Sequence, residues 1–324
     1  MTVLTTPTQP GRGNGLPPVP WSKLAWVSWR HYRIALFGAA TFLGVLALYL
    51  LIFGLKIRGA YAAASACSPG VGGQACNAAF QLFDNEYHNA AEVTAAVLNA
   101  VPVLVGVFAG APILARELET GTFRFAWTQG AGRTRWTLAR LALPALTVTA
   151  AAAAFSQLFG WFFYPFFATQ TGAFGPQYFG LTGIAFAAWT LAAFALGTLA
   201  GVLIGRVVPA MAAAMAAYTG LMLATVLYLR RHYQAPLLAR NGSTPSGANW
   251  NISQWWTGPN GKPVTDFAQI IGLIQHPQPG YTQWTLYQPA ARYWPFQSIE
   301  GGWLLGLSLL LMAATIWVVR RRAA

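Results

Sequence analysis

Charged side chains are scarce in this sequence, and their scarcity excludes most soluble classes of protein. Asp, Glu, Lys and Arg make up 8% of its 324 residues, against about a quarter in soluble domains. Hydrophobic residues make up 56% instead, and uncharged apolar runs recur along the chain. This composition predicts an integral membrane protein that lies in a lipid bilayer.

Acidic residues are the scarcest of all, with seven Asp and Glu against 20 Lys and Arg. A net charge of +13 in a soluble protein would suggest a nucleic-acid partner. In a chain this apolar, we interpret the basic excess as topology charge and as attraction to anionic lipid headgroups. The predicted partner is therefore the lipid bilayer and not nucleic acid.

Motifs for catalysis, metal binding and nucleotide binding are missing. Residues 258–263 resemble a P-loop only superficially, because they lack its spacing and the Ser or Thr after the lysine. No His-Glu-x-x-His pattern or aspartate-rich motif occurs, and the two cysteines have no nearby histidine pair. We predict no catalytic residue, metal or cofactor on this chain. None of the spans predicted below contains a carboxylate, which argues against an ion-coupled transporter.

Six uncharged runs are long enough to cross a bilayer, which takes about 20 apolar residues. They are residues 34–55, 93–115, 141–164, 181–205, 207–229 and 301–319. We therefore predict an all-α integral membrane fold. Residues 34–229 hold transmembrane helices one to five, and residues 301–324 hold the sixth helix and a basic end.

Lys and Arg gather on alternate sides of these spans, and such basic loops face the cytoplasm. The basic positions are Lys23, Arg30 and Arg33 before the first span, five arginines between residues 116 and 140, Arg206, and Arg320 to Arg322. We predict a multi-pass protein of the plasma membrane with both termini in the cytoplasm. Lys56, Arg58, Arg230 and Arg231 oppose this orientation but are outnumbered.

Three of the segments outside the predicted spans have a distinctive composition. Residues 1–20 are rich in Pro, Gly and Thr, which predicts a disordered cytoplasmic tail. Residues 21–33 place apolar side chains at helical spacing with basic residues between them, which predicts an interfacial helix. The alternative is an aromatic extension of the first span. Residues 230–300 are rich in Trp, Gln, Asn and Pro, which predicts a folded extracytoplasmic segment at the membrane surface.

Two spacings predict close contacts, the first within the chain and the second either within one chain or between two. Cys67 and Cys76 lie close together in one polar loop that the charge pattern places outside the cell, so we predict a disulfide between them. Two free thiols are the alternative. Gly197, Gly201 and Gly205 recur at i, i+4 and i+8 in the fourth span, which favours close packing of this helix on a neighbour.

The segment 116–140, between the second and third spans, concentrates charge in an otherwise apolar chain. It holds five of the 20 basic residues together with Glu117 and Glu119. A short, charged, helix-prone segment on the basic side of a membrane protein is where a soluble partner can push on the spans.

These features together resemble the permease subunit of an ABC exporter of the type-2 family, which exports drugs and polysaccharides. The local likeness is convincing across residues 113–145, where Glu117, Gly121 and Thr122 match the family's Glu-x-x-x-Gly-Thr element and residues 132–136 follow it with a basic stretch. The composition looks actinobacterial. Residues 230–300 depart from the family's short outer hairpin.

The resemblance implies a transporter subunit and not an enzyme. Two permease copies, identical or different, would pair above separate P-loop ATPase subunits that bind ATP and Mg. Segment 116–140 would be the coupling helix, and its ATPase-coupling residues would be Glu117, Glu119, Gly121, Thr122, Phe123 and Arg133. The apolar, aromatic composition predicts a hydrophobic or amphipathic cargo such as a drug, lipid or lipopeptide. The alternative is a channel or anchor component without ATP coupling.

Overall fold

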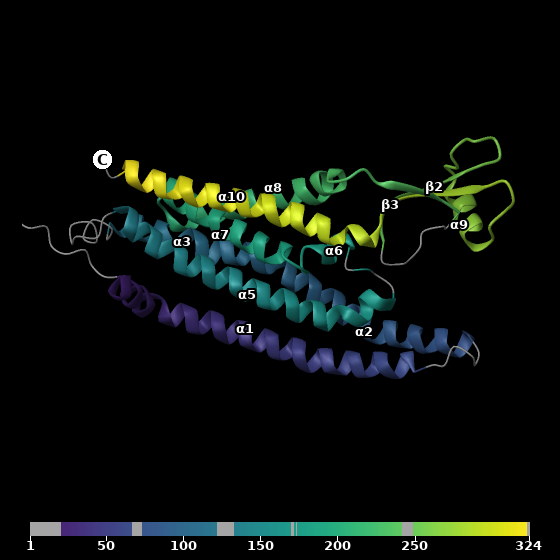
Figure 1. Ribbon diagram of the computed structural model, residues 1–324, viewed down its shortest axis with the longest axis horizontal. Coiled ribbons are helices and arrows are strands. Elements are labelled where there is room, and N and C mark those ends of the chain that lie inside the picture. Colours follow the sequence, from purple (N-terminus) through teal and green to yellow (C-terminus); the bar gives the residue numbers. More distant parts are fainter. Residues whose placement is uncertain are drawn as a thin grey trace, which may run out of the picture.

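The computed structural model describes residues 21–66, 73–121, 133–169, 172, 174–241 and 249–322. Long helices run side by side along the longest axis of the molecule, and a small sheet projects from one end (Figure 1). The start of α1, the end of α3 and the end of α10 lie at the opposite end (Figure 1). We call these the sheet end and the loop end of the bundle.

Six helical stretches in the described residues are long and apolar enough to cross a membrane, which confirms the predicted fold. They are Gly44–Ser65, Ala78–Thr120, Arg140–Phe167, Ala185–Ile204, Val207–His232 and Ala290–Arg321. Their elements are α1 (Trp21–Ser65), α2 (Gly73–Leu104), η1 (Val105–Gly110), α3 (Ala111–Thr120), α5 (Arg133–Thr169), α7 (Ala185–Ile204), α8 (Val207–Ala224), η2 (Thr225–Leu229), η3 (Arg230–His232), η4 (Ala290–Arg292) and α10 (Tyr293–Arg322).

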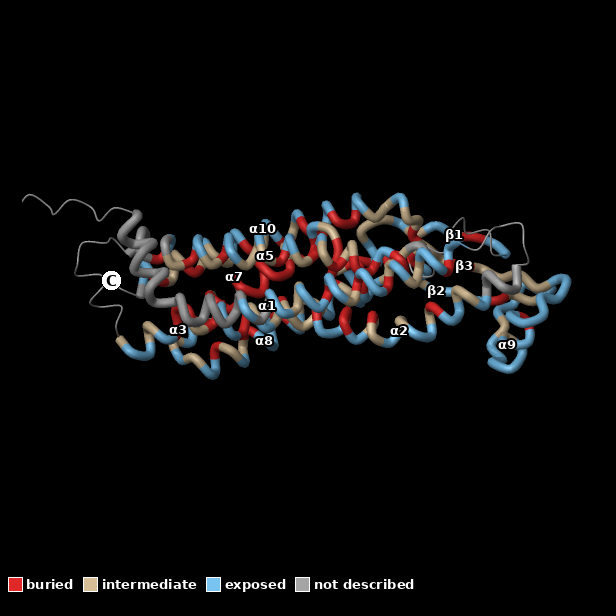
Figure 2. Tube along the Cα trace, turned by 90° about the horizontal axis from the view of Figure 1, so that it is seen from below, coloured by how far each residue is buried: buried red, intermediate tan, exposed pale blue. Residues whose placement is uncertain are grey.

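Helix α7 forms the centre of the bundle. In its most apolar stretch 61% of the residues are buried, against 17–44% in the other five spans. Its buried Ala and Gly residues let neighbouring backbones approach closely, which is how helices associate in lipid. Buried residues run along the inside of the bundle, and exposed positions line the outer sides of helices such as α1 and α8 (Figure 2).

Two spans contain π-helical turns, η1 and η2. Pro102 lies shortly before η1 and lacks the backbone N–H that a regular α-helix would use. The second π-helical segment ends the α8 stretch immediately before Arg230. Such turns are rare and gather at functional sites.

Residues 21–33 form the first turns of α1, in one continuous helix with the first span. Their predicted location at the membrane interface stays a prediction. The predicted tail, residues 1–20, lies outside the described residues.

The segment between the fifth and sixth spans carries a sheet domain, here defined as residues 233–289. It contains β1 (Leu237–Arg240), β2 (Trp250–Thr257), α9 (Phe267–Gln275) and β3 (Thr282–Gln288), and the antiparallel sheet has the order β1-β3-β2. Trp255 pairs with Trp284 across β2 and β3, and such aromatic cross-strand pairs stabilise a sheet. The sequence predicts a folded segment here but not its strands.

Candidate functional site

The segment predicted to couple to an ATPase begins at the end of α3, where an ion pair joins two spans. A carboxylate oxygen of Glu117 lies 2.6 Å from an Arg140 guanidinium nitrogen, and the two side chains are 15% and 12% exposed. Arg140 belongs to α5, so this pair fastens the second span to the third. Water reaches the pair poorly, which strengthens its attraction.

Glu119 fastens the same end of α3 to the fifth span. Its carboxylate accepts a hydrogen bond of 3.0 Å from the backbone N–H of Val207, the first residue of α8. A negative charge at a helix N-terminus satisfies an unpaired N–H and complements the helix dipole. Glu117, Glu119, Arg140 and Val207 together form what we call the α3 corner.

Glycines end two of the helices at this corner. Gly121 ends α3 with a φ of 70°, and Gly205 ends α7 with the same φ, a left-handed conformation that favours glycine. Gly205 thus ends α7, while Gly197 and Gly201 lie against another helix. Thr122 and Phe123 lie outside the described residues. Arg133 begins α5, but its side chain is outside the described part.

Gly197 and Gly201 face η1 and α3, where two backbones are in close contact. A Cβ atom at either glycine would overlap a carbonyl oxygen, that of Gly106 or that of Ala111. From the other side, a Cβ at Gly106 would lie 2.6 Å from the Ala193 carbonyl oxygen. The second and fourth spans therefore pack through their backbones. Cys67 lies outside the described residues and so does the Cys76 side chain, so their disulfide stays a prediction.

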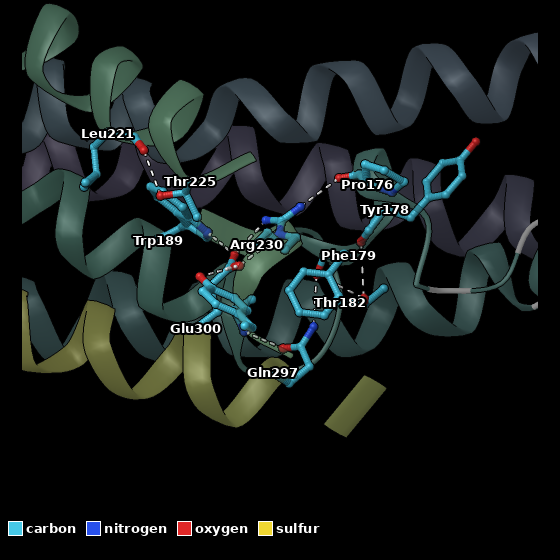
Figure 3. A network of polar contacts seen from close by, with 12 residues as sticks. Pro176, Tyr178, Phe179, Thr182, Trp189, Leu221, Thr225, Arg230, Gln297 and Glu300 are labelled. Carbon is cyan, nitrogen blue, oxygen red and sulfur yellow. Dashed lines mark hydrogen bonds and ion pairs between the residues drawn. The ribbon is translucent and has the colours of Figure 1, made fainter. Parts of the chain in front are cut away.

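At the sheet end, Arg230 and Glu300 form a buried bidentate ion pair (Figure 3). The Arg230 nitrogens lie 2.9 and 2.7 Å from the two Glu300 carboxylate oxygens. The side chains are 2% and 0% exposed. Charges so far from water persist only when paired and hydrogen-bonded. The pair joins the end of the fifth span to the sixth helix.

Two aromatic side chains complete the bonding of Glu300, and a third bonds to one of them. The Trp189 indole N–H donates to one carboxylate oxygen over 2.8 Å, and the Tyr233 hydroxyl donates to the other over 3.2 Å. Trp303 in turn donates to the Tyr233 hydroxyl over 2.9 Å. Burial, and after it the Glu300 carboxylate, raises the pKa of Tyr233, so this hydroxyl stays protonated and able to donate.

The network also holds the short helix α6 (Pro176–Phe179), which lies between the third and fourth spans (Figure 3). Arg230 donates to the Pro176 carbonyl over 3.1 Å, and its guanidinium carbon lies 4.6 Å from the centre of the Phe179 ring. Gln297 donates to the Phe179 carbonyl over 3.0 Å and accepts from the N–H of Ala185 over 2.9 Å. We call Arg230, Glu300, Trp189, Tyr233 and Gln297 the clamp.

Sequence reasoning missed the clamp because Glu300 stands just before the sixth apolar run. Helix α10 begins at Tyr293, so Glu300 lies within the candidate span Ala290–Arg321, and Glu92 lies within Ala78–Thr120. The expectation that no span contains a carboxylate is therefore wrong, and it no longer argues against ion coupling. One signal in the sequence could have pointed to the clamp. Arg230 is a basic residue on the predicted outer side of the membrane, where the charge pattern of the loops does not expect one.

A small cavity of about 20 Å³ lies beside the clamp, between the second, fourth and fifth spans and α6. Its lining is mostly apolar or aromatic, with few polar side chains. The lining residues are Asn99, Pro102, Pro176, Gly180, Phe186, Trp189, Tyr218, Met222, Val226 and Arg230. No cluster of three or more potential metal ligands occurs in the described residues.

The chain was compared with known families, curated proteins and solved structures. A family model described as ABC-2 membrane transporter related matches residues 40–230, which is more than half of the chain. The matched region covers the α3 corner and ends at Arg230, so the sheet domain and α10 lie beyond it. Neither the curated proteins nor the solved structures gave a match. With six candidate spans and a family match over most of five of them, the chain belongs to the ABC-2 membrane transporter related family.

Proposed function

We propose that this permease subunit belongs to an ATP-driven exporter of hydrophobic or amphipathic molecules. The family implies association with an ATPase. In the proposal, separate P-loop subunits bind and hydrolyse ATP with Mg, and two permease copies pair in the plasma membrane. In the same proposal, the end of the bundle where α1 begins and α10 ends (Figure 1) faces the cytoplasm, and the sheet domain lies outside the cell.

The α3 corner is the observation that carries this proposal. Glu117 ties the base of segment 116–140 to α5, and Glu119 ties it to α8. A partner that displaces this segment would therefore move the second, third and fifth spans together. A loop that served only as a connection would need no such attachment to three spans.

This geometry changes the roles expected of the two glutamates. From the sequence they are expected to meet the ATPase, but both carboxylates already have partners within the chain. We infer that Glu117 and Glu119 pass force from the coupling segment to the spans. Thr122 and Phe123, which follow the two glutamates in the sequence, then remain as candidates for contact with the ATPase.

The test is capture of the tagged chain from its native membrane, followed by identification of co-purifying proteins. We expect a P-loop ATPase with the wild type and markedly less with Glu117→Arg, because two arginines would then repel each other at the corner. The exchange Glu117→Arg with Arg140→Glu restores the opposite charges and should restore capture. Lys262→Glu, an exposed charge reversal in the sheet domain, is the control.

Two outcomes of this capture would count against the account. Absence of any P-loop ATPase from the wild-type sample would contradict the proposed function. Loss of the ATPase from both Glu117→Arg and the charge exchange would mean that Glu117 meets the ATPase directly and does not act through Arg140.

A further inference from the structure

We propose that the cavity beside the clamp binds the uncharged polar headgroup of an amphipathic molecule, a hydroxyl or an amide. The inference rests on the proposed function, and it names the class of molecule that such a transporter would carry. Three observations support it. Two polar side chains in the lining have unused hydrogen-bonding groups, the charged side chain of the lining is paired within the protein, and the cavity is small.

Tyr218 supplies the first unused polar group. Its side chain is only 4% exposed, and its ring packs edge-on against Trp189 at a centroid distance of 5.6 Å. Within the described part of the chain its hydroxyl has no hydrogen-bond partner, and the oxygen still reaches open space. This hydroxyl is therefore available to a ligand in the cavity that Tyr218 lines.

Asn99 supplies the second group, a carbonyl oxygen. Its amide nitrogen donates to the Ala95 carbonyl over 3.0 Å and to the Gln177 carbonyl over 3.2 Å, which uses both amide hydrogens. The side-chain oxygen accepts no hydrogen bond from any described residue. Together, Tyr218 and Asn99 offer one group that donates or accepts and one that only accepts. A ligand hydroxyl or amide matches both.

The charges at the cavity favour a neutral ligand. Arg230 lines it, but this guanidinium is bonded to both oxygens of Glu300. Trp189 and Tyr233 donate further hydrogen bonds to the Glu300 carboxylate. An anion would compete with Glu300, and a cation would find no unpaired carboxylate in the lining. A charged ligand would therefore lose hydration without gaining a counter-charge.

The volume restricts what enters. The cavity holds about 20 Å³, roughly the room for one water molecule or one small polar group. Met222 and Val226, on α8 and η2, are partly exposed members of the lining. We therefore place the apolar tail outside the cavity, beside these two residues. Pro102 and Val226, which lies in the π-helical segment η2, both line the cavity, and such irregular turns gather at functional sites.

The test is photolabelling of the purified full-length permease with three probes that share a dodecyl tail bearing a diazirine. The probes end in a hydroxyl, a carboxylate or a trimethylammonium group. We expect saturable labelling of residues 218–230 by the alcohol, at least about fivefold above that by either ion. Tyr218→Phe keeps the ring and removes only the hydroxyl, so it should lower labelling by about fivefold. Tyr164→Phe, at an exposed position of α5, should leave it unchanged.

Labelling by the charged probes that equals labelling by the alcohol would contradict the proposal that the headgroup in the cavity is uncharged. Labelling that does not saturate, or that is the same in Tyr218→Phe, would overturn the site itself. The measurement needs no ATPase and no transport. Its failure therefore leaves the proposed coupling intact, and a missing ATPase partner would not alter its result.

Discussion

Arg230 and Glu300 are 70 positions apart in the sequence, yet they form a bidentate ion pair that is almost completely buried. One ends the fifth span and the other lies in the first turns of α10, so the pair brings together both connections of the sheet domain. A motion that separates the fifth span from the sixth at this end must break the pair. A motion that keeps the pair intact must carry both spans and the sheet domain together.

Removal of one partner of this pair should destabilise the protein strongly. Arg230→Met or Glu300→Leu leaves a buried charge without a counter-charge, which typically costs about 3–5 kcal/mol. The double variant removes both charges and should be more stable than either single variant. Arg231→Met alters an exposed neighbour and should change stability by less than about 0.5 kcal/mol. Thermal unfolding in detergent measures all four, and single variants as stable as the wild type would refute the clamp.

Added volume at Gly197 should separate the second and fourth spans. Because a Cβ there would overlap the Gly106 carbonyl, we expect Gly197→Ala to cost about 1–3 kcal/mol, as overpacking of a core does. Gly220→Ala in α8 is the matched control, since nothing lies within 4 Å of its Cβ position. Thermal midpoints of the two variants should therefore differ. Equal midpoints would show that these helices are not in close backbone contact.

The proposed orientation predicts which end of the bundle reacts from outside the cell. In a Cys67→Ser, Cys76→Ser background, Lys262→Cys in the sheet domain should react with a membrane-impermeant maleimide on intact cells. Arg206→Cys, at the loop end, should react only after lysis, although both positions are exposed. The opposite pattern would invert the orientation and place the sheet domain in the cytoplasm.

The predicted disulfide has a direct chemical readout. If Cys67 and Cys76 lie outside the cell, they are in a compartment where disulfides persist. A non-reduced digest of the purified protein should then contain their two peptides joined, and reduction should release them. Alkylation of both thiols without prior reduction would favour the alternative of two free cysteines.

Hydropathy was enough to predict the six spans, because a charge within lipid is costly and uncharged runs are therefore conspicuous. It could not place Glu300, because α10 begins before the apolar run and a buried partner, Arg230, offsets the cost of the charge. That partner is distant in sequence, so no local pattern joins the two. The pairing of Trp255 with Trp284, and with it the sheet, is non-local in the same way.

The candidate site was predictable in part. The match of Glu117 and Gly121 to a family pattern drew attention to the end of α3, and Gly121 does end that helix in a left-handed turn. The bonds of Glu117 to Arg140 and of Glu119 to Val207 depend on how three spans pack. Composition and spacing contain no information about such packing, so the glutamates were expected to face a partner.

The most direct test of the account is ATP-driven movement of an amphipath by the complex captured from native membranes. The complex is reconstituted in vesicles with an NBD-labelled alkyl glycoside, an uncharged amphipath, and dithionite quenching reports its leaflet. We predict that ATP with Mg accelerates its movement above that in protein-free vesicles and that a non-hydrolysable ATP analogue does not. Movement at the same rate with and without ATP would contradict ATP coupling and identify the chain as part of a channel.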